Sequence, residues 1–219
     1  MKNNIKLVSD LSKINMKKNF IFVALNLSFI SFFCNGSIKL SNNIYLWCDG
    51  IMGKILYGYN KIPGSKFIKL FYKYKYTKIL IVGNYDEKQI SLLKKKFKTK
   101  VKGFAIPKIE IKDIRNYIPS TDQNTLILIT LPTPKQEILA YEISKINSNY
   151  KILCIGGGLE IATGIVKSCP ILISNLGLEF LWRLRTDTIR RLKRLIYTGI
   201  LYLYYSITGK VRKIKIIKI

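Results

Sequence analysis

Short runs of apolar residues alternate with amphipathic segments through the middle of the chain. The apolar runs occupy Lys78–Gly83, Val101–Ile106, Thr125–Leu131 and Lys151–Ile155. The segments between them carry apolar residues at helical spacing, which predicts helices at Asp86–Lys98, Ile109–Tyr117 and Lys135–Ile146. Continuous apolar strands that alternate with helices are typical of a parallel sheet covered on both faces. The pattern therefore predicts an α/β fold of the Rossmann-like type, with a mostly parallel sheet and helices on both of its faces.

The N-terminal part of the chain contains one more apolar run, Phe20–Cys34. This run is shorter than the ~20 residues that span a bilayer comfortably, and Asn26 interrupts it. A basic stretch precedes it, as in a signal peptide, but no small-residue cleavage site follows. We interpret the run as a buried strand followed by a buried helix or turn.

Glycine, proline and small polar residues follow three of the predicted strands, at Gly83-Asn84, Pro132-Thr133-Pro134 and Gly156–Gly158. Sheets of this type bind ligands beyond the carboxyl ends of their strands. Neither the dinucleotide-binding spacing G-x-G-x-x-G nor the P-loop spacing occurs at these positions. The glycines can form tight turns or let backbone N–H groups approach a phosphate, and spacing alone favours the turns.

The composition limits the chemistry that the chain can perform. Its 219 residues are 48% hydrophobic, which favours a buried core over disorder. Lys and Arg number 38 against 12 Asp and Glu, a formal net charge of +26, so anionic partners are expected. The absence of histidine excludes His-based triads and His-ligated metals. The four cysteines form no C-x-x-C pair, which favours a reducing cytosol over a disulfide framework.

Six short segments, in order along the chain, resemble motifs of the WecG/TagA/CpsF glycosyltransferase family. Their spacing on an alternating β/α chain makes the combined resemblance specific, although each segment alone is weak. The segments are Ala24-Leu25-Asn26, Cys48-Asp49-Gly50, Lys61–Phe67, Thr133–Glu137, Cys154–Gly164 and Gly177–Arg183.

Several positions depart from the family motifs and indicate a divergent member. Glu160 stands where the family has Asp, and Lys61 and Lys66 stand where it has Arg and Asp. Ser168-Cys169-Pro170 replaces an R-A-P element, and Asp187-Thr188 replaces an E-P element. A Lys in place of an Arg loses bidentate recognition of phosphate. The donor sugar of other members is therefore not transferred to this chain, and an inactive member is an alternative.

The resemblance implies an inverting transfer of a hexose-type unit, such as N-acetylmannosamine or its uronic acid, in the synthesis of a bacterial surface polysaccharide. The donor would be a UDP-sugar, and the acceptor a sugar linked to a polyprenyl diphosphate. The resemblance assigns the general base to Asp49, which by position alone would be a helix N-cap. The chain has no D-x-D pair, so we expect no metal site, no cofactor and metal-independent transfer.

Cations in the C-terminal part are expected to stabilise the departing diphosphate. The candidates are Arg183, Arg190, Arg191 and Arg194. Among them, Arg183, Arg190 and Arg194 are preferred. Gln136 is expected to hydrogen-bond a sugar or a base, while Glu137 is either a binding residue or an ordinary first-turn acid. The remaining residues with an expected role in substrate binding are Asn26, Lys61, Gly83, Thr133, Gly157 and Glu160.

The segment after residue 183 carries many basic residues and one acid, Asp187. Apolar residues recur in it at helical spacing, and tyrosines follow the basic cluster: Leu192, Leu195, Ile196, Ile200, Leu203, Tyr197, Tyr202, Tyr204 and Tyr205. This pattern predicts a helix that lies on an anionic membrane surface, although the helix could also pack on the core or on a second copy of the chain. We therefore expect a catalytic domain at residues 1–185, a membrane-associating appendage at 186–219, and a cytoplasmic protein on the inner face of the bacterial plasma membrane.

A basic nucleic-acid-binding protein is the rival class. Phe71–Lys78 interleaves tyrosines with lysines, and such a segment could stack bases and neutralise phosphates. No RNP, helix-turn-helix or zinc-finger pattern accompanies it, so we expect no nucleic-acid partner.

Overall fold

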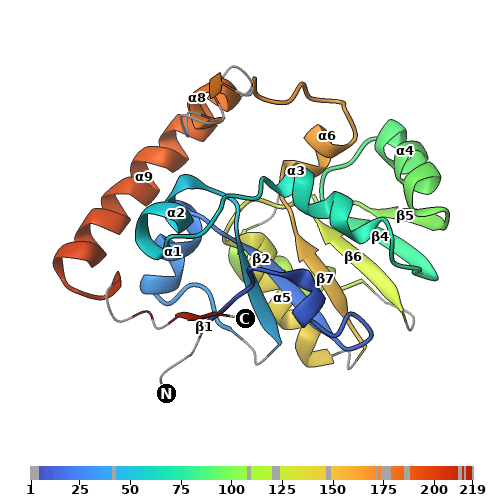
Figure 1. Cartoon of the computed structure of the whole chain (residues 1–219), viewed down its shortest axis with the longest axis horizontal. Helices are drawn as coiled ribbons and strands as arrows, with labels where there is room; N and C mark the ends of the chain where they lie inside the picture. The colour runs from blue at the N-terminus through green and yellow to red at the C-terminus, as the bar shows by residue number, and fades with distance from the viewer. Residues whose placement is uncertain are drawn as a thin grey trace.

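The computed structural model describes residues 5–40, 43–107, 110–119, 124–146, 149–170, 172–173, 179–184, 188–211, 214 and 216–218. Within these residues the chain forms one eight-stranded sheet with the strand order β5-β4-β6-β7-β2-β3-β1-β8. Every pair of neighbouring strands is parallel. The predicted Rossmann-like α/β fold is therefore confirmed (Figure 1). The strands are β1 (Ile5–Leu7), β2 (Phe20–Leu25), β3 (Ile44–Cys48), β4 (Lys78–Val82), β5 (Lys100–Phe104), β6 (Thr125–Ile129), β7 (Lys151–Cys154) and β8 (Ile216–Lys218).

Helices cover both faces of the sheet. On one face, α1 and α5 pack against a core that includes Phe29, Ile30, Leu139 and Ile143. On the other face, α3, η2, α4 and α6 bury an aromatic-rich core. The helices and 3-10 helices are η1 (Leu11–Lys13), α1 (Leu27–Cys34), α2 (Ile51–Tyr57), α3 (Gly64–Phe67), η2 (Ile68–Phe71), α4 (Glu87–Phe97), η3 (Ile111–Tyr117), α5 (Lys135–Ile146), α6 (Gly158–Ala162), α8 (Glu179–Leu184) and α9 (Thr188–Ile207).

Burial on both faces explains why the strands read as continuous apolar runs. All six residues of β2 are buried, because successive side chains point to opposite faces and both faces are covered. Ile21, Val23 and Leu25 belong to the core under α1 and α5. Phe20 and Phe22 belong to the core on the opposite face.

Most predicted elements have the predicted type. The helix predicted at Lys135–Ile146 is α5, with the same bounds, and the run at Phe20–Cys34 forms β2 followed by α1. The helix predicted at Ile109–Tyr117 is instead the shorter 3-10 helix η3. The strands β1 and β8 were not predicted, because each has only three residues and lies toward one edge of the sheet, where lysines interrupt the apolar pattern.

The C-terminal segment is joined to the rest of the fold at two places. The helix α9 packs along α1, where the Ser31 hydroxyl donates a hydrogen bond to the carbonyl oxygen of the buried Thr198 at 2.8 Å. The strand β8 pairs with β1, with Lys6 opposite Ile217. Figure 1 shows α9 along one side of the molecule, outside α1 and α2. The predicted boundary at residue 186, between a catalytic domain and a membrane-associating appendage, stays a prediction. The segment after it contributes α9 to the helical layer and β8 to the sheet.

None of the helices in the described part of the chain is long and apolar enough to cross a membrane.

The register of the sheet aligns the carboxyl ends of its central strands. Val82 pairs with Ile129, Ile129 pairs with Cys154, and Cys154 pairs with Val23. Two residues further along β2, Leu25 pairs with Cys48 of β3. The segments that follow β2, β3, β4, β6 and β7 therefore emerge at the same edge of the sheet, which is where ligands of such folds bind.

Candidate active site

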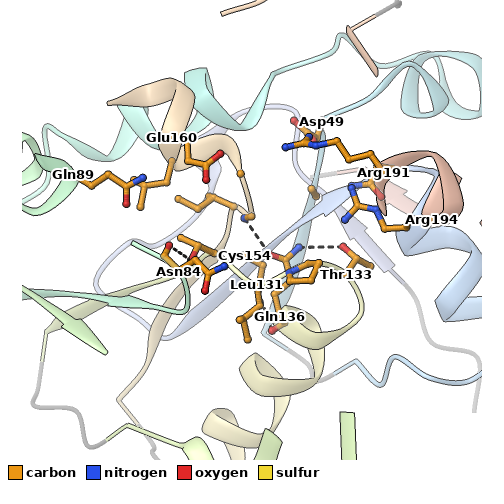
Figure 2. A pocket seen from close by; sticks show the side chains of 18 residues that line it. Asp49, Asn84, Gln89, Leu131, Thr133, Gln136, Cys154, Glu160, Arg191 and Arg194 are labelled. Carbon is orange, nitrogen blue, oxygen red and sulfur yellow. Dashed lines mark hydrogen bonds between the residues drawn. The ribbon is translucent and has the colours of Figure 1, made fainter. Parts of the chain in front are cut away.

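A pocket of about 340 Å³ opens at this edge of the sheet. Its floor includes Cys154 at the end of β7, Leu131 in the segment after β6, and Gln136 at the start of α5, and α9 lies over one end of it (Figure 2). At that end are Asp49, Arg191, Arg194 and Thr133, whereas Asn84, Gln89 and Glu160 lie at the other end.

Asp49 follows β3 directly and lines the pocket. Its Oδ1 atom accepts a hydrogen bond from the backbone N–H of Gly64 at 2.7 Å. Gly64 begins α3, whereas the N-cap of α2 is Gly50, so the alternative interpretation of Asp49 as the cap of the next helix is wrong. The hydrogen bond from Gly64 instead fixes the carboxylate from across the loop.

Packing beneath α3 holds Gly64 in position. The rings of Trp47 and Phe67 stack with their centroids 4.1 Å apart, and the Trp47 indole N–H donates to the carbonyl oxygen of Ile62 at 3.2 Å. On the other side, α6 approaches α3 so closely that a Cβ atom on Gly158 would lie 3.1 Å from the carbonyl carbon of Gly64. A glycine at position 158 therefore permits the contact that places α3, and with it the donor to Asp49.

The segment after β6 forms a hydrogen-bonded network under the pocket. The Gln136 amide N–H₂ donates to Glu137 Oε1 at 2.8 Å and to Thr133 Oγ1 at 3.2 Å. The Gln136 Oε1 atom accepts from the backbone N–H of Gly156 at 3.1 Å. Gly156 has φ +47°, a left-handed conformation that glycine adopts without strain. Gln136 thus connects the turn after β7 to the start of α5. Both ends of its amide group have protein partners, and its role in substrate binding stays a prediction.

Glu137 lies in the first turn of α5, as one of the two interpretations of the sequence expected, and it is buried. Only 2% of its surface is accessible. Burial raises the pKa of Glu137 to about 7, against the lowering effect of its hydrogen bonds from Gln136 and Thr133 and of the positive charge of Arg194. A substantial fraction of the carboxyl groups is therefore protonated near neutral pH.

Two buried thiols line or border the same region. Burial, together with the charge of Asp49, raises the pKa of Cys48 to about 11. Burial also raises the pKa of Cys154 well above its ordinary value, with the charge of Glu137 adding to the effect. Both thiols are protonated at neutral pH, so neither is an activated nucleophile.

The other end of the pocket carries neutral amides and one carboxylate. Asn84 follows β4, and the buried Gln89 lies in the first turn of α4. Gln89 Oε1 accepts from the backbone N–H of Asp86 at 3.1 Å and completes a capping box. The D-x-x-Q spacing could have identified this orientation from the sequence, but the pocket position of Gln89 was not predicted. Gly157 and Glu160, which were predicted, line the same region at the start of α6.

Two arginines from α9 reach the pocket. Figure 2 shows Arg191 extending toward Asp49, and Arg194 lying beside Thr133. Of these two, only Arg194 was among the preferred cations, because the sequence does not show which face of α9 turns toward the pocket. The side chains of Arg183 and Arg190 lie outside the part of the chain that the structure describes, so their predicted roles stay predictions.

Three other predicted residues have additional or different partners. Asn26 lines the pocket, and its Oδ1 atom also caps α1 by accepting from the Phe29 N–H at 3.0 Å. Lys61 is not among the pocket-lining residues and forms an ion pair with Glu179 at 2.7 Å. Gly83 is also outside the lining; it has φ +113°, and a Cβ atom there would lie 2.8 Å from Thr130 Oγ1. Their binding roles are untested.

The aromatic residues of Phe71–Lys78 serve the core. Phe71 and Tyr76 are buried, and the Tyr72 ring packs edge-on against Phe97 with the ring centroids 4.8 Å apart. Phe71 and Tyr76 are therefore not accessible for stacking on nucleic-acid bases, and Tyr72 and Tyr74 are half-buried.

A protein-family model described as glycosyl transferase WecG/TagA/CpsF family matches residues 46–215 of the chain. The matched segment begins in β3 and includes Asp49, Gln136, Glu137 and both pocket arginines of α9. This match confirms the predicted family and contains five of the six segments, since Ala24-Leu25-Asn26 lies before it.

The raised pKa of Glu137 predicts an unusual pH dependence of stability. A carboxyl group whose pKa is higher in the folded than in the unfolded chain costs stability as the pH rises from about 4.5 to about 7, because the folded state then resists losing its proton. Glu137→Gln removes this cost. Relative to wild type, its free energy of unfolding should therefore rise by on the order of 3 kcal/mol between pH 4 and pH 8.

Urea denaturation of both proteins across this pH range measures the difference. Glu142→Gln is the matched control, because it removes a carboxylate from the same helix. Glu142 forms an ion pair with Lys145 at 3.2 Å and is not among the pocket-lining residues. A constant difference between Glu137→Gln and wild type at all pH values would show that the pKa of Glu137 is the same in the folded and the unfolded chain.

Proposed function

Since the chain belongs to the WecG/TagA/CpsF family of glycosyl transferases, we propose that it is an inverting transferase in the synthesis of a bacterial surface polysaccharide. The donor is a UDP-sugar, and the unit transferred is a hexose such as N-acetylmannosamine, its uronic acid or a related sugar. The acceptor is a sugar that is linked to a polyprenyl diphosphate.

The observation that carries this proposal is the meeting of one carboxylate and two arginines at the same end of the pocket. Asp49 comes from the end of β3, whereas Arg191 and Arg194 come from α9, more than a hundred residues later in the chain. A transfer that inverts the anomeric centre needs a base for the acceptor hydroxyl on one side and stabilisation of the leaving group on the other. These residues supply both kinds of group.

The proposed step is a single displacement. The acceptor hydroxyl oxygen forms a bond to the anomeric carbon of the donor sugar, and the bond from that carbon to the β-phosphate oxygen breaks. Asp49 receives the proton of the hydroxyl, and UDP leaves with the bonding electron pair. The backbone N–H of Gly64 holds the Asp49 carboxylate in a fixed orientation for this transfer.

The developing charge on UDP is stabilised by Arg191 and Arg194. Guanidinium groups form paired hydrogen bonds with phosphate oxygens, and they act more strongly in a pocket than in bulk water. At the far end, the amides of Asn84 and Gln89 and the carboxylate of Glu160 suit a nucleoside, which presents hydrogen-bond donors and acceptors without charge. The donor thus lies along the pocket with its diphosphate under α9.

The transfer is proposed to be metal-independent, since the chain has neither a D-x-D pair nor histidine and the two arginines can balance the diphosphate charge. Among the described residues, no cluster of three or more Cys, Asp or Glu side chains is arranged to hold a metal ion. Full activity in excess EDTA is the expected result, and a loss of activity that manganese restores would contradict this proposal.

The polyprenyl acceptor places the enzyme at an anionic membrane surface, proposed to be the inner face of the plasma membrane. The outward side of α9 carries a row of exposed apolar side chains, here called the outer stripe: Ile189, Leu192, Ile196, Ile200, Leu203 and Ile207. The opposite side of the helix packs on α1 and carries the pocket arginines. An exposed apolar row on a chain with a net charge of +26 suits the interface of an anionic bilayer.

Asp49→Asn should lower the rate of sugar transfer by roughly 100-fold or more, because it removes the base. The asparagine oxygen can still accept the hydrogen bond from Gly64, so the loop and the affinity for UDP should stay close to those of wild type. Transfer to a synthetic polyprenyl-diphosphate-linked sugar and calorimetric binding of UDP measure the two effects. Asp10→Asn, which changes a carboxylate that caps η1, is the control. Turnover of Asp49→Asn within a few-fold of wild type would remove Asp49 from the mechanism.

Ile196→Ser combined with Ile200→Ser should weaken binding to phosphatidylglycerol vesicles by roughly tenfold or more, because two apolar side chains no longer enter the interface. These residues are 53% and 62% exposed, so their replacement leaves the contact with α1 intact. Leu195, which the sequence placed in the same row, is only partly exposed and is a poorer site for this test.

Turnover on a short-chain, water-soluble acceptor should be unchanged in this double variant. Ile146→Ser is the matched control, since Ile146 is 71% exposed at the end of α5 and is not part of the outer stripe. Vesicle binding equal to that of wild type would place the membrane contact elsewhere. Sedimentation equilibrium of the same proteins shows whether the outer stripe instead joins two copies of the chain.

A further inference from the structure

A partly buried ion pair joins two segments that lie more than a hundred residues apart in the sequence. The ammonium group of Lys61 is 2.7 Å from the Oε1 atom of Glu179, and each side chain is 17% exposed. By contrast, the side chains of Lys112 and Glu110 pair while 75% and 74% exposed. Water screens the first pair less than the second, so its two charges attract each other more strongly.

The loop that carries Lys61 belongs to the support of the proposed base. The next residue, Ile62, is hydrogen-bonded to β3 through both of its backbone groups. Its N–H donates to the carbonyl oxygen of Cys48 at 2.7 Å, and its carbonyl oxygen accepts from the Trp47 indole at 3.2 Å. Two residues further on, the Gly64 N–H donates to the base itself at 2.7 Å. A group that holds this loop therefore also helps to hold the base.

At the other end of the pair, Glu179 is the first residue of α8, which packs against α9. An isolated helix of six residues is not stable in water, so contacts with the rest of the protein determine where α8 lies. Figure 1 shows α8 beside the first turns of α9. Those turns carry Arg191 and Arg194, which line the pocket. A group that holds α8 therefore also acts on the part of α9 that presents the arginines.

We propose that Lys61 and Glu179 are a positioning pair, which fixes the proposed base relative to the arginines of α9. Neither residue is among those that line the pocket, so the pair acts through the loop before α3 and through α8. Its effect on turnover rests on the proposed function, since only a transferase needs the base and the cations in register. The link between the loop and α8 does not depend on that function.

Direct contact of Lys61 with an anionic substrate, which the sequence predicted, is the alternative. The two roles differ in what Glu179→Gln does. If Lys61 binds a phosphate directly, loss of the Glu179 charge releases the ammonium group for binding and should not lower turnover. If the two residues position the site together, removal of either charge should have the same effect.

The experiment is a double-mutant cycle on the full chain with Lys61→Met, Glu179→Gln and the double variant. In each single variant kcat for sugar transfer should fall by roughly tenfold, because small displacements of catalytic groups are costly, and KM for the donor should change little. The double variant should lose no more than either single variant, and both single variants should bind UDP equally well. Lys61→Arg, which keeps the charge, should retain most of the turnover.

Two variants are matched controls. Lys69→Met makes the same change at an exposed lysine of η2, and Glu110→Gln makes the same change at an acid whose ion pair is exposed. Both should turn over like wild type, because exposed charges of this kind contribute little to the position of other groups.

Hydrogen–deuterium exchange of the same proteins, read by mass spectrometry, tests the link in the absence of substrate. The backbone amides of residues 62–67 and 179–184 should exchange roughly fivefold faster in both single variants, because each segment has lost a contact. The amides of residues 198–207 should be unchanged, since the hydrogen bond from Ser31 to Thr198 is still present.

Three results would overturn the proposal. The first is wild-type turnover and exchange in Glu179→Gln, and the second is a double variant in which the two single effects add. The third is weaker UDP binding in Lys61→Met alone, which would show that Lys61 contacts the substrate. If the wild-type protein transfers no sugar to any acceptor, the proposed function fails, and the exchange data still decide whether the pair joins the loop to α8.

Discussion

The parallel pairing of β2 with β7 is the constraint on which the rest of this structure depends. It joins strands that lie far apart in the sequence, and it does so between residues that are buried on both faces of the sheet. In such an interior every backbone N–H and C=O must form its hydrogen bond with a neighbouring strand. The register therefore cannot shift without leaving buried polar groups without hydrogen bonds. With Val23 opposite Cys154, the loop that carries Asn26 emerges beside Gly156. The pocket is a consequence of that register, since its two walls are otherwise far apart along the chain.

Around the pocket, backbone N–H groups in loops and at helix starts donate to side chains. Asp49 accepts from Gly64, Gln136 accepts from Gly156, and Gln89 accepts from Asp86. Asp49 and Gln136 each connect two segments that are 15 and 20 residues apart in the sequence, whereas Gln89 closes a capping box at the start of its own helix. These bonds help to give a defined shape to a site that is built partly from loops. The network also contains the buried carboxylate of Glu137, whose charge the surrounding protein stabilises only in part.

The sequence predicted the fold more completely than the site, for physical reasons that individual residues illustrate. Burial on both faces leaves a continuous apolar run, which is why β6 and β7 were recognised, whereas the three residues of β8 leave almost no pattern. Asp49 was identified because it follows a strand inside a motif. Gln89 was missed because its pocket position depends on how α4 packs, and Arg191 was passed over because helix rotation is set by contacts with α1. The partner of Lys61, Glu179, lies over a hundred residues away, so no local pattern indicates the pair.

The two sides of α9 lead to one mechanical consequence. The helix carries Arg191 and Arg194 on the side of the pocket and the outer stripe on the side of solvent, and both sets of side chains project from the same rigid backbone. An α-helix resists bending over so few turns, because its backbone hydrogen bonds run along its axis. A surface that held the outer stripe would therefore also restrict the arginines, and a ligand that held the arginines would restrict the outer stripe. Linkage requires that this effect be reciprocal. Because the Ser31 hydroxyl binds the carbonyl oxygen of Thr198 in the middle of α9, the contact with α1 positions both sets of side chains together.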